Sequence, residues 1–213
     1  MTDRQMADIF DEVDEDLKRD QMQVLWARYG KYLMIAVSLV VLGVAARQGY
    51  QAWQANQAEA AAAAYHSATQ QDDVAAALAK VKDSFNPGYK MLAAFRSAAA
   101  LGEKGDLEAA ESAYLALAED KNVGTLYQQA ALLLSVMNAP KNRDVAALRS
   151  RLAGLEGAAG PWQAMALEQS AGLALREGDR KTALEKYEAL VNVADIPPQL
   201  RQRASQMVKI LKG

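Results

Sequence analysis

Apolar residues are concentrated in one continuous run near the start of the chain. Residues 32–46 contain no charged side chain, and no other stretch of the sequence resembles them. This run is shorter than the roughly 20 residues that a membrane-spanning helix needs. Aromatic residues extend it on both sides, namely Trp26, Tyr29, Tyr50 and Trp53. Because such interfacial aromatics are typical of a helix that crosses a bilayer, the pattern predicts a transmembrane helix over residues 29–50.

A buried core helix and a cleavable signal peptide fit the apolar run less well. A buried core helix would need a comparably apolar surface around it, and the rest of the sequence offers none. A cleavable signal peptide has a short basic segment before its apolar region. Here a long segment rich in Asp and Glu precedes the run, so an uncleaved anchor is the better interpretation.

The distribution of basic residues gives the anchor a direction. Five basic residues precede the run: Arg4, Lys18, Arg19, Arg28 and Lys31. After the run only Arg47 occurs before Lys80. The positive-inside rule therefore predicts a cytoplasmic N-terminus and an exported C-terminal region. In a bacterium this is a single-pass inner-membrane protein whose C-terminal domain is periplasmic.

Residues 1–28 form a separate acidic element. Apolar residues recur in it at helical spacing among many aspartates and glutamates: Met6, Ile9, Phe10, Val13 and Leu17. The pattern predicts a cytoplasmic amphipathic helix. Such a short helix either frays in isolation or docks on a cytoplasmic partner, and the sequence leaves both open.

Residues 51–213 carry helical patterns throughout, without the alternation expected of strands. No proline separates the apolar run from residues 51–69, so the membrane helix is predicted to continue into the first helix of this region. Breaks recur at Asn86-Pro87-Gly88, Asn122–Gly124, Asn138–Asn142, Gly154–Pro161 and Pro197-Pro198. Interruptions at such regular intervals indicate a helical repeat.

A repeat is present. Gly105-Asp106-x3-Ala110-x3-Tyr114 has the same pattern as Gly178-Asp179-x3-Ala183-x3-Tyr187. In each copy the glycine suits the left-handed end of one helix, and the aspartate suits the N-cap of the next. The small alanine lets two helices approach, and the tyrosine packs on the same face. Weaker copies begin at Asp73 and Asp144, so the four capping aspartates are 33, 38 and 35 residues apart.

This period and these offsets resemble the tetratricopeptide repeat. The resemblance implies a tetratricopeptide-like α-solenoid of about four helix pairs over residues 51–213. With the transmembrane helix predicted from the apolar run, the expected fold is all-α. Residues 199–211 follow Pro197-Pro198 and are expected to form the terminal capping helix that a solenoid requires. The third repeat is degenerate, because Leu148 and Leu152 stand where the other copies have Ala and Tyr.

The register of the repeats predicts a partner-binding groove on the first helix of each pair. The side chains expected to face it are Leu92, Phe95, Gln128, Leu132, Met165 and Glu168. A mixed apolar groove suits an extended or helical peptide. The alternative is that the capping helix or the next repeat covers these side chains.

Composition argues against an enzyme. The chain has no cysteine and one histidine, His66, so disulfides, thiol catalysis and zinc–thiolate sites are excluded. Neither a nucleophile–base pair nor a phosphate-binding loop nor a metal-ligand cluster is apparent, and no cofactor is expected. Residues 47–213 contain 19 basic and 18 acidic side chains, so no basic patch suggests nucleic acid.

The whole arrangement resembles the YfgM-like ancillary subunits of the SecYEG translocon. The segment Asp8–Asp20, followed by Leu25-Trp26 and Tyr29-Gly30 before the anchor, is similar to the N-terminal signature of the alphaproteobacterial members. The resemblance implies a non-enzymatic adaptor that associates with the secretion channel and with periplasmic chaperones or exported chains. Two alternatives stay open. One is an envelope scaffold that homo-oligomerises, and the other is a stress-response regulator that acts through the cytoplasmic helix.

Overall fold

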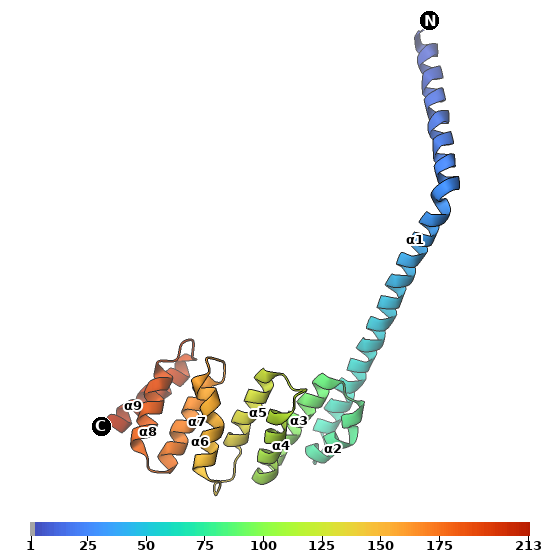
Figure 1. The fold of residues 1–213 in the computed structure, drawn as a ribbon. Coiled ribbons are helices and arrows are strands. Elements are labelled where there is room, and N and C mark those ends of the chain that lie inside the picture. Colours follow the sequence, from blue (N-terminus) through green and yellow to red (C-terminus); the bar gives the residue numbers. More distant parts are fainter. Residues whose placement is uncertain (1–2) are drawn as a thin grey trace. The chain divides into compact units, whose positions relative to one another are not determined.

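The computed structural model describes the backbone of residues 3–213 and the side chains of residues 26–213. Within that range the chain is helical and contains no strand, so the predicted all-α class is confirmed (Figure 1). The α-helices are α1 (Asp3–Thr69), α2 (Val74–Val81), α3 (Pro87–Glu103), α4 (Leu107–Glu119), α5 (Thr125–Met137), α6 (Val145–Gly157), α7 (Gln163–Arg176), α8 (Arg180–Val191) and α9 (Pro198–Lys212). A short 3₁₀ helix, η1 (Lys82–Ser84), follows α2.

The chain divides into two compact units, Met1–Ala58 and Glu59–Gly213. Helix α1 is helical throughout and crosses this boundary, as the lack of an intervening proline predicts. In the first unit the described side chains of α1 are exposed almost without exception. The apolar side chains of the amphipathic pattern in residues 1–28, Met6 to Leu17, lie outside the residues whose side chains are described.

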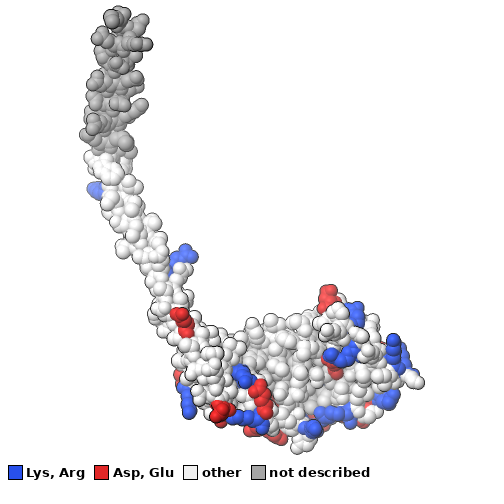
Figure 2. Space-filling view, turned by 180° about the vertical axis from the view of Figure 1, so that it is seen from behind, with Lys and Arg blue, Asp and Glu red and all other residues white. Residues whose placement is uncertain are grey.

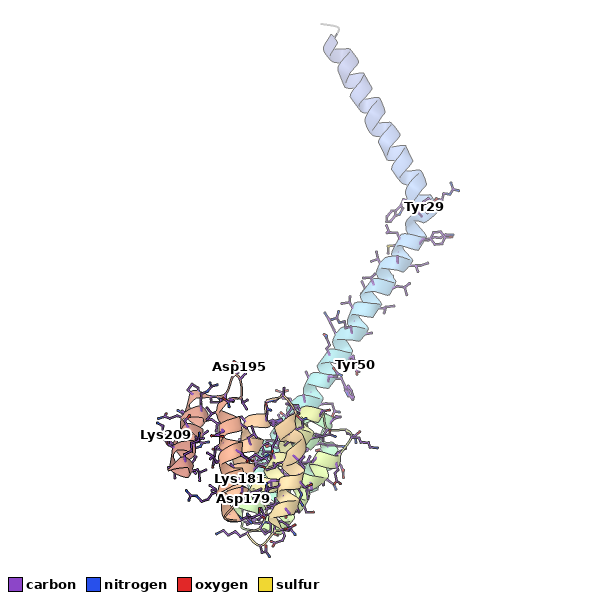
Figure 3. All side chains as sticks on the ribbon, turned by 60° about the vertical axis from the view of Figure 1, so that its left-hand side comes forward. Tyr29, Tyr50, Asp179, Lys181, Asp195 and Lys209 are labelled. Atoms are coloured by element: carbon purple, nitrogen blue, oxygen red, sulfur yellow. The ribbon has the colours of Figure 1, made fainter. Side chains whose placement is uncertain are left out.

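One helix of the described chain, over Trp26–Thr69, is long and apolar enough to cross a membrane. Its apolar side chains point outward, and Tyr29 and Tyr50 flank the run (Figure 3). Between Lys31 and Arg47 the surface of this helix carries no charged side chain (Figure 2). A core helix of a soluble domain would bury such apolar residues, and these are exposed.

The second unit is built from helix pairs. The last turns of α1 pair with α2, and α3 with α4, α5 with α6, and α7 with α8 follow in order (Figure 1). Helix α9 packs on α8 and buries Leu200 and Ala204 against the α7–α8 pair. The observed unit therefore has the predicted four helix pairs and a C-terminal capping helix.

Two glycine–aspartate turns join the helices of the second and fourth pairs. Gly105 and Gly178 have φ angles of 86° and 78°, which only glycine adopts without strain. In the first turn the Asp106 N–H donates to the carbonyl of Leu101 at 3.0 Å, which closes the end of α3. The Asp106 carboxylate then accepts the Ala109 N–H at 3.1 Å and starts α4. One residue thus ends one helix and begins the next.

Ion pairs connect successive second helices of the array. Glu111 in α4 accepts hydrogen bonds from Arg143 in the α5–α6 loop and from Arg151 in α6. Glu156 in α6 pairs with Lys186 in α8. Each pair adds a polar link between one repeat and the next, beside the apolar packing of α4 on α5 and of α6 on α7.

Candidate peptide-binding surface

Large apolar side chains that stay exposed in the repeat unit are confined to two places. They lie on the first helices α3, α5 and α7 or on the capping helix, with 36–63% of their area exposed: Leu92, Leu126, Tyr127, Met137, Met165 and Ile210. The second helices α2, α4, α6 and α8 carry none. Four of these residues lie within the first two turns of their helices, and we call Leu92, Leu126, Tyr127 and Met165 the first-helix surface.

A hydrogen bond joins two parts of this surface. The indole N–H of Trp162, at the start of α7, donates to the backbone carbonyl of Leu126 at 2.9 Å. The first turns of α5 and α7 therefore lie side by side, and Leu126 is close to the start of the helix that carries Met165. Leu92 and Met165 are also equivalent in the repeat, because each lies 13 residues before the left-handed glycine of its turn.

Of the six predicted groove residues, some are exposed and the others pack or form hydrogen bonds within the repeat unit. Leu92 and Met165 are exposed. Phe95 and Leu132 are half-buried, and the Phe95 ring packs on Tyr114 with 6.2 Å between the ring centroids. The Gln128 amide donates to the carbonyl of Asp120 at 2.7 Å, so this side chain fastens the α4–α5 loop.

Glu168 is held by the capping helix. Its two carboxylate oxygens accept hydrogen bonds from the guanidinium of Arg203 in α9, at 2.6 and 3.0 Å, and these bonds raise the pKa of Arg203. Beside this pair a hollow of about 490 Å³ is lined by Pro161, Met165 and Ile196. The capping helix therefore closes part of the surface at the last repeat and leaves Met165 accessible.

The residues of the repeat pattern belong to the scaffold. Ala110 and Ala183 are fully buried between helices, and Tyr114 and Tyr187 are buried beside them. Burial raises the pKa of both tyrosines above its ordinary value. These residues position the first helices and are not available to a ligand.

The comparison with protein families agrees with this geometry. The tetratricopeptide repeat-like domain family matches residues 23–208. This chain belongs to that family. The search of curated proteins and the search of solved structures gave no match. A tetratricopeptide repeat-like domain is an interaction module, so the chain is expected to bind protein partners.

The described part of this tetratricopeptide-like chain has few side-chain groups of the kind that bind metals or catalyse reactions. Among the described residues no group of three or more His, Cys, Asp or Glu side chains could hold a metal ion. His66 is exposed on α1, and its ring lies 3.0 Å from the Gln70 amide.

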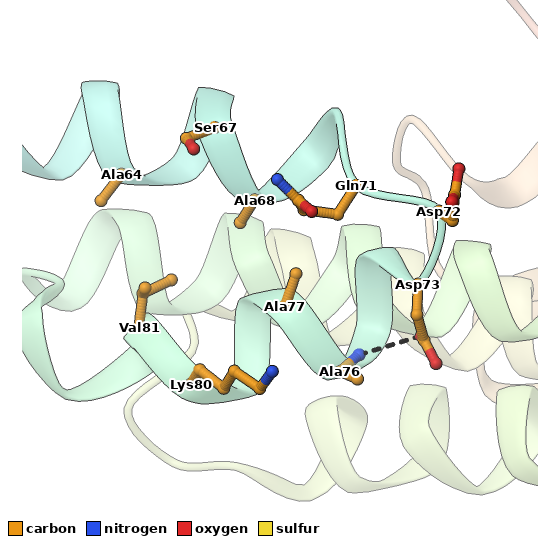
Figure 4. Close-up of a pocket in the computed structure, with 10 residues that line it drawn as sticks. All are labelled: Ala64, Ser67, Ala68, Gln71, Asp72, Asp73, Ala76, Ala77, Lys80 and Val81. Carbon is orange, nitrogen blue, oxygen red and sulfur yellow. Dashed lines mark hydrogen bonds between the residues drawn. The ribbon is translucent and has the colours of Figure 1, made fainter.

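A hollow of about 390 Å³ lies between the last turns of α1 and helix α2 (Figure 4). Its floor is formed by small side chains, among them Ala64, Ala68 and Ala77. Asp73 at its edge caps α2 by accepting the Ala76 N–H, and it also pairs with Lys104 at 2.8 Å. The bond to Lys104 and then the bond to Ala76 lower the pKa of Asp73. The carboxylate of Asp73 is thus already bonded to groups of the chain itself.

Reasoning from the sequence missed two residues of the first-helix surface, Leu126 and Tyr127, and the neighbouring Trp162. Leu126 and Tyr127 are both exposed at the start of α5. The signal that would have helped is Gly124, which starts α5 without a side-chain cap and places the next three residues in an open first turn.

Proposed function

We propose that this protein is a non-enzymatic, membrane-anchored adaptor at the SecYEG translocon, where its tetratricopeptide-like surface links exported chains to periplasmic chaperones. One observation carries the proposal. Outside the capping helix, every large apolar side chain exposed in the described repeat unit lies on a first helix. A contiguous exposed apolar patch is typical of an interaction site, and Leu126 lies beside the start of the helix that carries Met165.

The chemistry of the first-helix surface suits a neutral, apolar segment of polypeptide. Charged side chains of α3 and α7 are already paired, because Arg96 pairs with Glu103 at 2.8 Å and Glu168 pairs with Arg203 of the capping helix. A charged partner would have to compete with those pairs. An extended segment with apolar side chains can bury them against Leu92, Leu126 and Met165 without breaking those ion pairs. Emerging exported chains offer such segments before they fold.

The location rests on the anchor and on the resemblance to the YfgM-like subunits. The apolar part of α1 is exposed along its length, and the excess of basic residues before it favours a cytoplasmic N-terminus. The protein is then anchored in the bacterial inner membrane, with residues 51–213 in the periplasm. Protease added to spheroplasts is expected to digest residues 51–213 and to leave the N-terminal segment protected; protection of the repeat unit would reverse the orientation.

Site-specific photocrosslinking in intact membranes tests the adaptor role. A photoreactive residue at Met165 or Tyr127 is expected to crosslink to exported chains and periplasmic chaperones, and mild detergent extraction is expected to retain channel subunits. A probe at Ala116, which is exposed on second helix α4, is the matched control. Equal crosslinking from Ala116, or purification without any channel subunit, would refute the proposal. Self-crosslinking alone would favour the scaffold alternative.

A further inference from the structure

The ion pairs between second helices follow a positional rule that fails at one junction. Arg151 in α6 and Lys186 in α8 each lie seven residues after the aspartate that caps their helix. Each takes a carboxylate from the preceding second helix, Glu111 in α4 or Glu156 in α6. The equivalent position in α4 is Ala113, so α4 has no cation there to bind α2.

Two lysines lie beside this first junction, Lys82 in η1 and Lys90 in α3. Within the described residues no carboxylate lies within 4.0 Å of the ammonium groups of Lys82 or Lys90. The junction is bridged only at its loop end, by Lys104 and Asp73. Lys82 and Lys90 are therefore without a carboxylate partner among the described side chains.

A hollow lies beside these two lysines. Helix α2 has 8 residues, whereas α4, α6 and α8 have 12 or 13, so α2 covers less of the helix beneath it. The space left over α3 measures about 430 Å³. Its floor is small or apolar and its rim is charged: Leu78, Ala79, Ala93, Ala94 and Ser97 with Lys82, Asp83 and Lys90.

This hollow faces away from the first-helix surface. On a helix with about 100° per residue, Lys90 and Ala94 each lie about 160° from Leu92, on the opposite side of α3. The hollow and the first-helix surface can therefore be occupied at the same time, and a substitution in one leaves the side chains of the other in place.

We propose that this hollow is a second docking site, which takes an acidic amphipathic helix of a protein partner. The apolar side of such a helix fits the floor of Leu78, Ala93 and Ala94, where small side chains permit close approach of a helix. Its carboxylates pair with Lys82 and Lys90, which together outweigh Asp83, the one acidic group of the rim. A lipid acyl chain fits less well, because pockets for small ligands enclose most of the ligand surface, whereas Ala79 and both lysines are exposed.

Binding of a synthetic peptide tests the site. A fluorescent peptide with the sequence of residues 3–20 is acidic and has apolar residues at helical spacing, so it has the required chemistry. The protein is the full chain in lipid nanodiscs, and the readout is fluorescence anisotropy. We expect saturable binding that weakens with added salt. Lys82→Glu combined with Lys90→Glu is expected to weaken it by about tenfold, because two ion pairs are replaced by like-charge repulsion.

Three controls make the result decisive. Lys121→Glu with Lys141→Glu reverses two exposed lysines elsewhere in the repeat unit and should leave the affinity within about twofold. A peptide of shuffled sequence should bind at least fivefold more weakly, and a peptide with lysines in place of its acidic residues should bind the Lys82→Glu/Lys90→Glu variant better than the unmodified chain. Far-UV circular dichroism checks that each variant is folded. Three results would each overturn the proposal. The first is absence of peptide binding, and the second is an equal loss of affinity in both double variants. The third is that the chain binds anionic lipid vesicles with the same dependence on Lys82 and Lys90.

Discussion

Replacement of Glu111 by alanine is expected to weaken the middle of the solenoid. Glu111 is 2% exposed, and its carboxylate is held by three hydrogen bonds. Arg143 donates from Nε at 2.9 Å and from Nη2 at 2.6 Å to one oxygen, and Arg151 donates from Nη1 at 2.6 Å to the other. The substitution removes the acceptor that joins these two cations to α4.

The cost follows from the exposure of the two arginines. Removal of one partner from a buried ion pair costs about 3–5 kcal/mol when the remaining charge stays buried. Here the side chains of Arg143 and Arg151 are 41% and 24% exposed, so water can hydrate them after the change. We therefore expect Glu111→Ala to lower the free energy of unfolding by about 2–3 kcal/mol. Glu111→Gln, which keeps the shape and loses the charge, should lie between Glu111→Ala and the unmodified chain.

Urea unfolding of the full chain in detergent, followed by circular dichroism at 222 nm, measures this effect. Glu119→Ala is the matched control, because Glu119 is exposed on the same helix and its loss should change stability by less than about 0.5 kcal/mol. Because repeats are coupled only to their neighbours, the weakened junction should also broaden the transition. An effect of Glu111→Ala no larger than that of Glu119→Ala would refute the assignment of this ion pair as a structural link.

Four further outcomes are expected. Gly178→Ala should destabilise the repeat unit by about 1 kcal/mol, because φ at this residue is 78°. Gly172→Ala should instead stabilise it by up to about 1 kcal/mol, since Gly172 lies within α7 and an added Cβ would contact nothing within 4 Å. Thermal unfolding distinguishes the two signs. Asp106→Ala should lower stability by about 1 kcal/mol through loss of the α4 N-cap, and Asp106→Asn should largely retain it in the same assay. Burial raises the pKa of Glu111, but the bonds from Arg151 and Arg143 outweigh it and hold the pKa below its ordinary 4.5. Its contribution is therefore complete above that pH and is lost as the pH falls through the lowered pKa, so an acid titration of Glu111→Gln should show a shallower loss of stability than the unmodified chain.

Much of the fold could be predicted from local chemistry. The pattern Gly-Asp-x3-Ala-x3-Tyr encodes a left-handed helix end, an N-cap and two packing residues within ten positions, so it specifies a helix–turn–helix without knowledge of distant contacts. The capping role of Asp144 likewise follows from sequence, and its carboxylate accepts the N–H groups of Ala146 and Ala147. The apolar helix is equally accessible to prediction, because an uncharged run flanked by aromatics is a property of neighbouring residues.

The binding surface is harder to predict because it depends on residues far apart in the sequence. Glu168 has the spacing of a groove residue, but Arg203, 35 positions later, neutralises it. Gln128 has the same spacing and instead fastens a loop through Asp120. A repeat register gives the direction of a side chain and not the identity of its partner. Whether a predicted groove side chain is exposed or paired therefore has to be read from the structure.

The two sides of the repeat unit differ in chemistry. Apolar packing of α4 on α5 and of α6 on α7 joins the repeats, and the Glu111 and Glu156 ion pairs add polar links between second helices. Leu92 and Met165 take no part in these clusters and stay exposed. The first junction is the exception, since α2 is short and Ala113 replaces the bridging cation. A partner whose carboxylates bound both Lys82 in η1 and Lys90 in α3 would join these two elements from outside, so its binding would stiffen this end of the repeat unit.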